Sequence, residues 1–169
     1  LCVLLLVLVA TGCQTVPYTG RRQIQLISAA EETQMGVASY EKIVGKATLS
    51  TDAQTNAMVQ RVGSRIAAVT GLDYTWEFRV IQDDKQVNAF ALPGGKVAVY
   101  TGIFEVAQDE GGLAAVIAHE IAHALAHHGA ERMSQGMLAQ LGAVGLSIAL
   151  GGSNPATADA VMQAYGLGA

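Results

Sequence analysis

The chain has 169 residues, a length that suits one domain with a hydrophobic core and is short for two. Hydrophobic residues make up 51% of the sequence, charged residues only 14%, and the formal net charge is −4. The sequence has no basic stripe of the kind that nucleic-acid binding needs, so its composition argues against a DNA or RNA partner.

A short apolar run, LCVLLLVLVATGC, opens the sequence and ends at Cys13. The run is too short to span a bilayer, but it suits the hydrophobic region of a signal peptide. Its last residues, Ala10-Thr11-Gly12-Cys13, resemble the lipobox of bacterial lipoproteins. We therefore expect residues 1–12 to be a partial signal peptide and Cys13 to be the lipidated first residue of the mature chain. The competing interpretations are a lone hydrophobic N-terminal strand and a cytosolic helical enzyme whose apolar N-terminus belongs to the core.

The residue after the lipidated cysteine bears on localisation. Gln14 follows Cys13 where an aspartate would favour retention in the inner membrane. We expect a periplasmic protein anchored by its lipid to the outer membrane, or to the cell membrane if the cell is not Gram-negative. The run starts at Leu1 without a methionine or a basic segment, and a helix expected after Asn154-Pro155 is still running at Ala169. Both ends of the sequence thus look incomplete.

Residues 13–27 are polar and turn-prone, which predicts a tether. Ser28 and Glu31 have the spacing of a capping box, so a helix should begin there and end near Val44. A second helix is expected to begin at Thr51 and to end at Gly71. Its apolar residues recur at helical spacing: Ala53, Met58, Val62, Ile66 and Val69.

The hydrophobic period then changes from helix to strand. YTWEFRVI alternates, which places Trp76, Phe78 and Val80 on one face of a strand. VNAFALPGGKVAVYTG predicts two strands around a turn at Pro93-Gly94-Gly95. The turn does not match a phosphate-binding loop, because the GxxxxGK[ST] spacing is absent.

Helical sequence returns from about Asp109 to Met133. The glycine-interrupted segment from Gly136 to Gly152 is too short for a membrane span, so a buried or interfacial helix is expected there. Together the elements predict a mainly helical α+β fold, with residues 28–169 as the N-terminal part of one domain.

All four histidines of the chain lie between residues 119 and 128, and the first and second belong to the motif HEIAH. Positions four apart on a helix project side by side, so His119 and His123 can bind one zinc ion. Glu120 flanks that position, where a carboxylate can act first as general base and then as general acid in peptide hydrolysis. The surrounding residues are apolar on most sides, which predicts a buried helix, and buried polar groups need a partner such as a metal.

The segment AAVIAHEIAHALAHHGAERMS resembles the active-site helix of the HtpX/Oma/CaaX-prenyl-protease (Ste-type) family of zinc metallopeptidases. NAFALPGGKVAVYTGI resembles the hairpin before that helix, and TGRRQIQLIS resembles the N-terminal segment of the family's periplasmic lipoprotein branch. The resemblance implies a gluzincin-type core that holds one zinc ion per subunit, with His119 and His123 as ligands and Glu120 as catalytic base. It also implies that an extended polypeptide substrate pairs with an edge strand formed by Val97, Ala98, Val99 and Tyr100.

The family takes its third ligand from a glutamate on a later helix, and no such pattern follows His123 here. Glu131 would lie about 12 Å further along the same helix, and we expect the third ligand beyond Ala169. His128 would point about 140° away from His123 on a continuous helix, so His127 and His128 are expected to be structural or peripheral.

We therefore expect a membrane-tethered zinc endopeptidase that hydrolyses cell-envelope proteins, in protein quality control. Because the 169 residues supply only two expected ligands, we expect them to bind zinc weakly or not at all and to be inactive on their own. The alternative is a non-catalytic envelope lipoprotein, a binding or assembly factor with a degenerate metal site.

Overall fold

The structure is a computed structural model that describes residues 13–16 and 20–149. The described residues form two compact units. One contains residues 16, 20–21 and 27–129 and carries the three-stranded sheet, and the other contains residues 13–15, 22–26 and 130–149. The expected mainly helical α+β fold with a small sheet is confirmed.

The sheet unit begins with two helices whose N-termini are capped by side chains. In α2 (Ala29–Val44) the Ser28 hydroxyl accepts the Glu31 N–H and the Glu31 carboxylate accepts the Ser28 N–H, so the expected capping box is present. In α3 (Ala53–Ala67) the cap is Asp52, whose carboxylate accepts two main-chain N–H groups. The expected cap at Thr51 is therefore wrong. The helix also ends at Ala67, before Gly71, which leaves Val69 81% exposed.

The strands are β3 (Glu77–Ile81), β4 (Ala89–Leu92) and β5 (Lys96–Tyr100), in the order β3-β5-β4. β4 and β5 form the expected antiparallel hairpin, whereas β3 runs parallel to β5. Gly94 and Gly95 turn the hairpin with φ of 88° and 77°, a region that side chains with a Cβ avoid. After β5, the short helices η1 (Thr101–Ile103) and α4 (Phe104–Ala107) lead into α5 (Glu110–Leu125).

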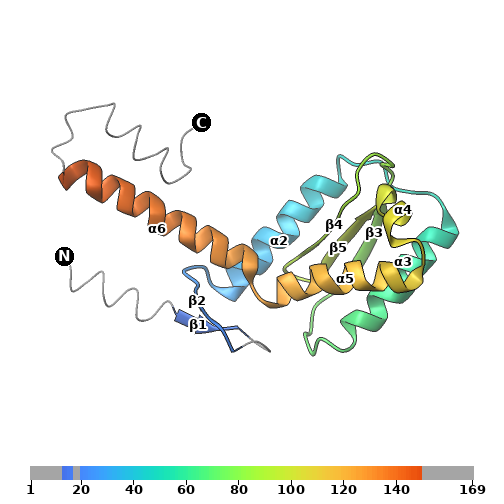
Figure 1. The fold of residues 1–169 in the computed structure, drawn as a ribbon, viewed down its shortest axis with the longest axis horizontal. Helices are drawn as coiled ribbons and strands as arrows, with labels where there is room; N and C mark the ends of the chain where they lie inside the picture. The colour runs from blue at the N-terminus through green and yellow to red at the C-terminus, as the bar shows by residue number, and fades with distance from the viewer. Residues whose placement is uncertain (1–12, 17–19, 150–169) are drawn as a thin grey trace. The chain divides into compact units, whose positions relative to one another are not determined.

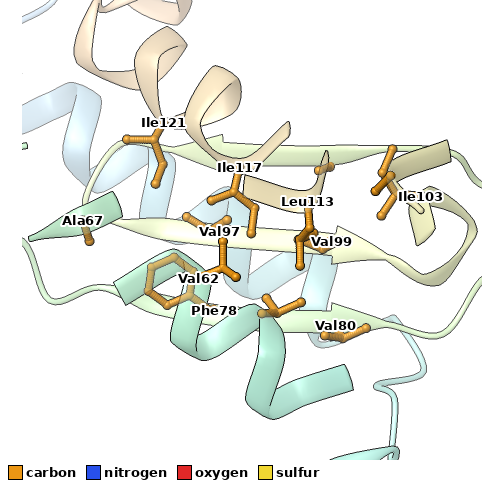
Figure 2. Packing of buried hydrophobic residues seen from close by; sticks show 13 residues of the cluster. Val62, Ala67, Phe78, Val80, Val97, Val99, Ile103, Leu113, Ile117 and Ile121 are labelled. Atoms are coloured by element: carbon orange, nitrogen blue, oxygen red, sulfur yellow. The ribbon is translucent and has the colours of Figure 1, made fainter. Parts of the chain in front are cut away.

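The sheet lies between two helical layers (Figure 1). On one face, Leu113, Ile117 and Ile121 of α5 pack with α3 side chains over Val97 and Val99 (Figure 2). These five side chains are at most 1% exposed, so they form the centre of the core. The core therefore fixes α5 against the sheet.

The opposite face of the sheet is covered by α2. Tyr40 is 2% exposed, packs edge-on against Phe90 and donates its hydroxyl to the Val97 carbonyl at 3.4 Å. Ala98 and Ile81 complete this smaller cluster. The alternation predicted for the strand around Trp76, Phe78 and Val80 is confirmed, since all three contribute to the α5 face.

The second unit contains a short antiparallel pair, β1 (Cys13–Thr15) with β2 (Arg22–Ile24), and most of α6 (His128–Ala149). The segment expected to be a tether thus contains two paired strands. Within this unit, the Ser134 hydroxyl accepts the Leu26 N–H at 2.9 Å. The helix expected from Gly136 is present in α6 as far as Ala149. Among residues 136–142, whose side chains the structure describes, none is buried, and Met137 and Leu141 are 45% and 66% exposed.

No helix among residues 13–16 and 20–149 is both long and apolar enough to cross a bilayer. The expected signal peptide and the helix after Asn154-Pro155 lie outside the described residues. Cys13 is described only by its backbone in β1, so its lipidation remains a prediction.

Candidate metal and peptidase site

The HEIAH motif lies in the second half of α5. The helix begins after Asp109, whose carboxylate accepts the Gly112 N–H at 2.8 Å. Its buried residues recur at intervals of four, which leaves the motif's polar side chains on the flanks of the buried stripe. His119 is exposed, and Glu120 and His123 are partly exposed. Water can therefore reach all three side chains, as hydrolysis requires.

The expectation of a helix buried on most sides is wrong for the described residues. Ala115, Ala118 and Ala122 are exposed, and only one stripe of α5 faces the sheet. The motif histidines therefore do not need a metal to offset burial in a core. Their geometry, and not their burial, indicates whether they can share a metal ion.

His119 and His123 direct their imidazole rings at one point. Their Nε2 atoms lie 3.0 Å apart, and their rings are nearly perpendicular, at 84°. Two ligand atoms that bind one zinc ion at about 2.0–2.1 Å in tetrahedral geometry lie about 3.3 Å apart. A separation of 3.0 Å is close to that value, so the pair fits a shared zinc ion after a small rotation of either ring.

The Glu120 side chain lines a surface groove between α5 and the start of β4. The groove has a volume of about 400 Å³. Its walls are formed by residues from β4 and its preceding loop, from η1 and from α5: Val87, Asn88, Ala89, Ile103, Ala115, Val116, His119 and Glu120. The groove thus places the candidate base and one candidate ligand beside a strand edge.

A third ligand is not brought to this site by the described residues. Within residues 13–16 and 20–149, no group of three or more His, Cys, Asp or Glu side chains is arranged to hold a metal ion. Glu131 lies on α6, which is separated from α5 by a break in the helix. The glutamate expected beyond Ala169 lies outside the described residues and stays a prediction.

A break in the helix places His127 and His128 differently from the positions expected on one continuous helix. A single helix from Asp109 to Met133 does not form, because His127 adopts a φ of 53° between α5 and α6. The chain turns there and brings His128 back toward the site, with its Nδ1 2.5 Å from Nδ1 of His123. The expectation that His128 points away from His123 is therefore wrong.

His127, between α5 and α6, contacts a side chain of α2. Its Nδ1 is 2.7 Å from Oε2 of Glu32, a side chain that is only 3% exposed. Sequence reasoning missed Glu32, because a glutamate in the first turn of a helix has an ordinary explanation in the helix dipole. The two residues are 95 positions apart, so no local pattern could have joined them.

The strand expected to receive substrate is not at an edge. β5 pairs with β3 on one side and with β4 on the other, so the main-chain groups of Val97 to Tyr100 are used within the sheet. The edge strand next to the groove is β4, which has no second strand partner among the described residues. The Tyr100 N–H bonds to the Asn88 carbonyl, and in an antiparallel pair every second residue bonds to the partner strand. The main-chain groups of Ala89 and Ala91 therefore point away from β5.

A helix with two clustered histidines and an adjacent glutamate, beside the edge of a small sheet, is the arrangement of the HExxH metallopeptidases. Residues 53–167 match peptidase family M48. The chain belongs to this family, which places it among the metallopeptidases, a class of hydrolases.

Two relatives show how far the similarity extends. The mitochondrial metalloendopeptidase OMA1 of Schizosaccharomyces pombe is 41% identical over 128 residues, which are 73% of this chain and 38% of that protein. The beta-barrel assembly-enhancing protease of Escherichia coli is 30% identical over 125 residues, which are 73% of this chain and 26% of that protein. The aligned region therefore spans well under half the length of either relative.

Proposed function

We propose that this chain carries the gluzincin-type catalytic centre of a zinc-dependent endopeptidase that acts on cell-envelope proteins. The observation that carries the proposal is the pair of Nε2 atoms, 3.0 Å apart, with Glu120 beside them in a groove. His119 and His123 would hold one zinc ion together with a third ligand from outside the described residues. Bound there, zinc would supply Lewis acidity, which polarises the scissile carbonyl and makes water a better nucleophile at neutral pH.

The polypeptide substrate binds as an added strand along β4. The main-chain groups of Ala91 and the carbonyl of Ala89 offer hydrogen bonds to an extended peptide, while the Asn88 side chain accepts the Ala89 N–H. A peptide in this position runs past the groove in which His119 and Glu120 lie. Pairing with main-chain atoms favours extended segments over particular side chains, as expected of an enzyme that removes unfolded proteins.

Glu120 moves the proton during hydrolysis. Its carboxylate takes a proton from the attacking water and returns it to the nitrogen of the leaving amine. The side chain is only partly buried, which leaves the carboxylate in reach of water, as a general base requires.

Cys13 carries a lipid anchor that holds the enzyme at the periplasmic face of the outer membrane. The function of the enzyme there is protein quality control. The bacterial relative named a beta-barrel assembly-enhancing protease supports an envelope setting, and the mitochondrial relative named a metalloendopeptidase supports the reaction type. Mass spectrometry of the mature protein tests the anchor, because a diacylated Cys13 at the N-terminus is expected.

The central test compares the full-length protein with its Glu120→Gln variant. We expect one zinc ion per chain in both proteins, and loss of cleavage of an unfolded outer-membrane protein only in the variant. Unchanged zinc content and thermal unfolding serve as the folding control. Absence of stoichiometric zinc in the unsubstituted protein, or full activity of Glu120→Gln, would instead favour a non-catalytic lipoprotein with a degenerate site.

A further inference from the structure

The closest polar contact around the candidate ligands joins His123 to His128. Their Nδ1 atoms are 2.5 Å apart, and the ring centroids are 4.8 Å apart. Two ring nitrogens this close cannot both carry a proton and cannot both present a lone pair. One of the two Nδ1 atoms is therefore a donor and the other an acceptor.

The role of His123 as a ligand decides which atom donates. A histidine binds metal through an unprotonated nitrogen, and Nε2 of His123 is the atom that faces His119. The single proton of neutral His123 is then on Nδ1, so His123 donates and Nδ1 of His128 accepts. Metal-binding histidines commonly donate their second N–H in this way, which fixes the ring orientation.

His128 reaches this position only because the helix is interrupted. The Ala126 N–H still bonds to the Ala122 carbonyl, but the His127 N–H bonds three residues back, to the Ala124 carbonyl. His127 then takes a left-handed backbone conformation, which is unfavourable for a residue with a Cβ. Something in the surrounding structure has to hold the chain in this turn.

Glu32 supplies that restraint. Its carboxylate is buried on α2 and lies within hydrogen-bonding distance of the His127 ring, through Oε2. Its Oε1 has no hydrogen-bond partner among the described residues, so His127 is the main polar contact of this carboxylate. Releasing His127 would leave a buried carboxylate unpaired, which is costly.

We propose that His128 is a positioning residue that accepts the Nδ1–H of His123 and thereby orients its Nε2 for zinc, and that the Glu32–His127 contact holds the turn that presents His128. The inference rests on the proposed function, because it assigns His123 as a ligand. It predicts that zinc affinity depends on a hydrogen-bond acceptor at position 128 and on a carboxylate at position 32.

The first experiment measures zinc affinity of the full-length protein by competition with a chelator. His128→Leu removes the acceptor, and its matched control His128→Asn has nearly the same size and keeps an acceptor oxygen. Loss of such a contact typically weakens metal binding about 10- to 100-fold, so we expect that loss in His128→Leu and recovery of most of the affinity in His128→Asn. Nitrogen-15 NMR of the zinc form should show the His123 Nδ1 proton protected from exchange in the unsubstituted protein and in His128→Asn, but not in His128→Leu.

The second experiment tests the restraint from α2 with Glu32→Leu, alone and combined with His128→Leu. If Glu32 acts through His128, the two substitutions are not additive, and Glu32→Leu weakens zinc binding much less when His128 is already leucine. Additive losses would overturn this part of the inference. Thermal unfolding of the metal-free proteins separates a general loss of stability from a loss of ligand orientation.

The outcomes also separate this inference from the function on which it rests. His119→Ala should abolish zinc binding. If the unsubstituted protein binds no zinc, the proposed function fails. If it binds zinc and His119→Ala does not, but His128→Leu binds as tightly as the unsubstituted protein, the ligand pair stands and the role of His128 is refuted.

Discussion

Substrate capture along β4 can be tested at one main-chain nitrogen. The N–H of Ala91 points away from β5, so Ala91→Pro removes a donor from the open edge without removing a hydrogen bond of the sheet. The matched control Ala91→Val adds a side chain of similar bulk and keeps the N–H. The comparison therefore isolates one hydrogen bond between enzyme and substrate.

The expected effect follows from the net free energy of one hydrogen bond. A net contribution of about 0.5–1.5 kcal/mol corresponds to a rise in KM of about 2- to 12-fold. Because the bond is present in both the bound substrate and the transition state, kcat should stay nearly unchanged. Steady-state cleavage of a fluorogenic peptide by the full-length enzyme measures both constants.

One result would refute the assignment of β4. If Ala91→Pro and Ala91→Val give the same KM, the Ala91 N–H makes no bond to substrate. Thermal unfolding checks that the proline variant is folded. As a positive control for damage to the sheet, Phe90→Pro removes a bond of the β4–β5 ladder and should lower the melting temperature.

Three further substitutions, the first with a matched control, test the packing and capping that support the site. Ile117→Ala should lower the free energy of unfolding in urea by about 2–5 kcal/mol because Ile117 is fully buried, whereas Val69→Ala, at a position 81% exposed, should change it by less than about 0.5 kcal/mol. Gly63→Ala should destabilise the sheet unit by about 1–3 kcal/mol in the same assay, because a Cβ there would overlap the Phe78 ring; an unchanged midpoint would show that the ring moves aside freely. Hydrogen bonds from a threonine hydroxyl and a main-chain N–H lower the pKa of Asp52, so its stabilising effect is complete above about pH 4 and disappears as the pH falls through the lowered folded-state pKa. Asp52→Ala should therefore be less stable than the unsubstituted protein at pH 7, and the difference should shrink in acid in pH-dependent thermal melts.

The sequence by itself determined the features that depend on neighbouring residues. The capping box at Ser28, the hairpin turn at Gly94-Gly95 and the side-by-side placement of His119 and His123 all follow from contacts within four residues along the chain. Such features form in the same way whatever the rest of the fold does. The mainly helical composition with a small sheet could be predicted for the same reason.

Only the tertiary structure decided the features that join distant residues. The order β3-β5-β4 makes Val97 to Tyr100 central, and no local pattern distinguishes a central strand from an edge strand in a three-stranded sheet. The left-handed position in the turn is a histidine and not a glycine, so the sequence does not mark it, and the His127 ring contacts Glu32 on a helix 95 residues earlier. That contact brings the fourth histidine of the chain onto the second, where a continuous helix would have turned it away.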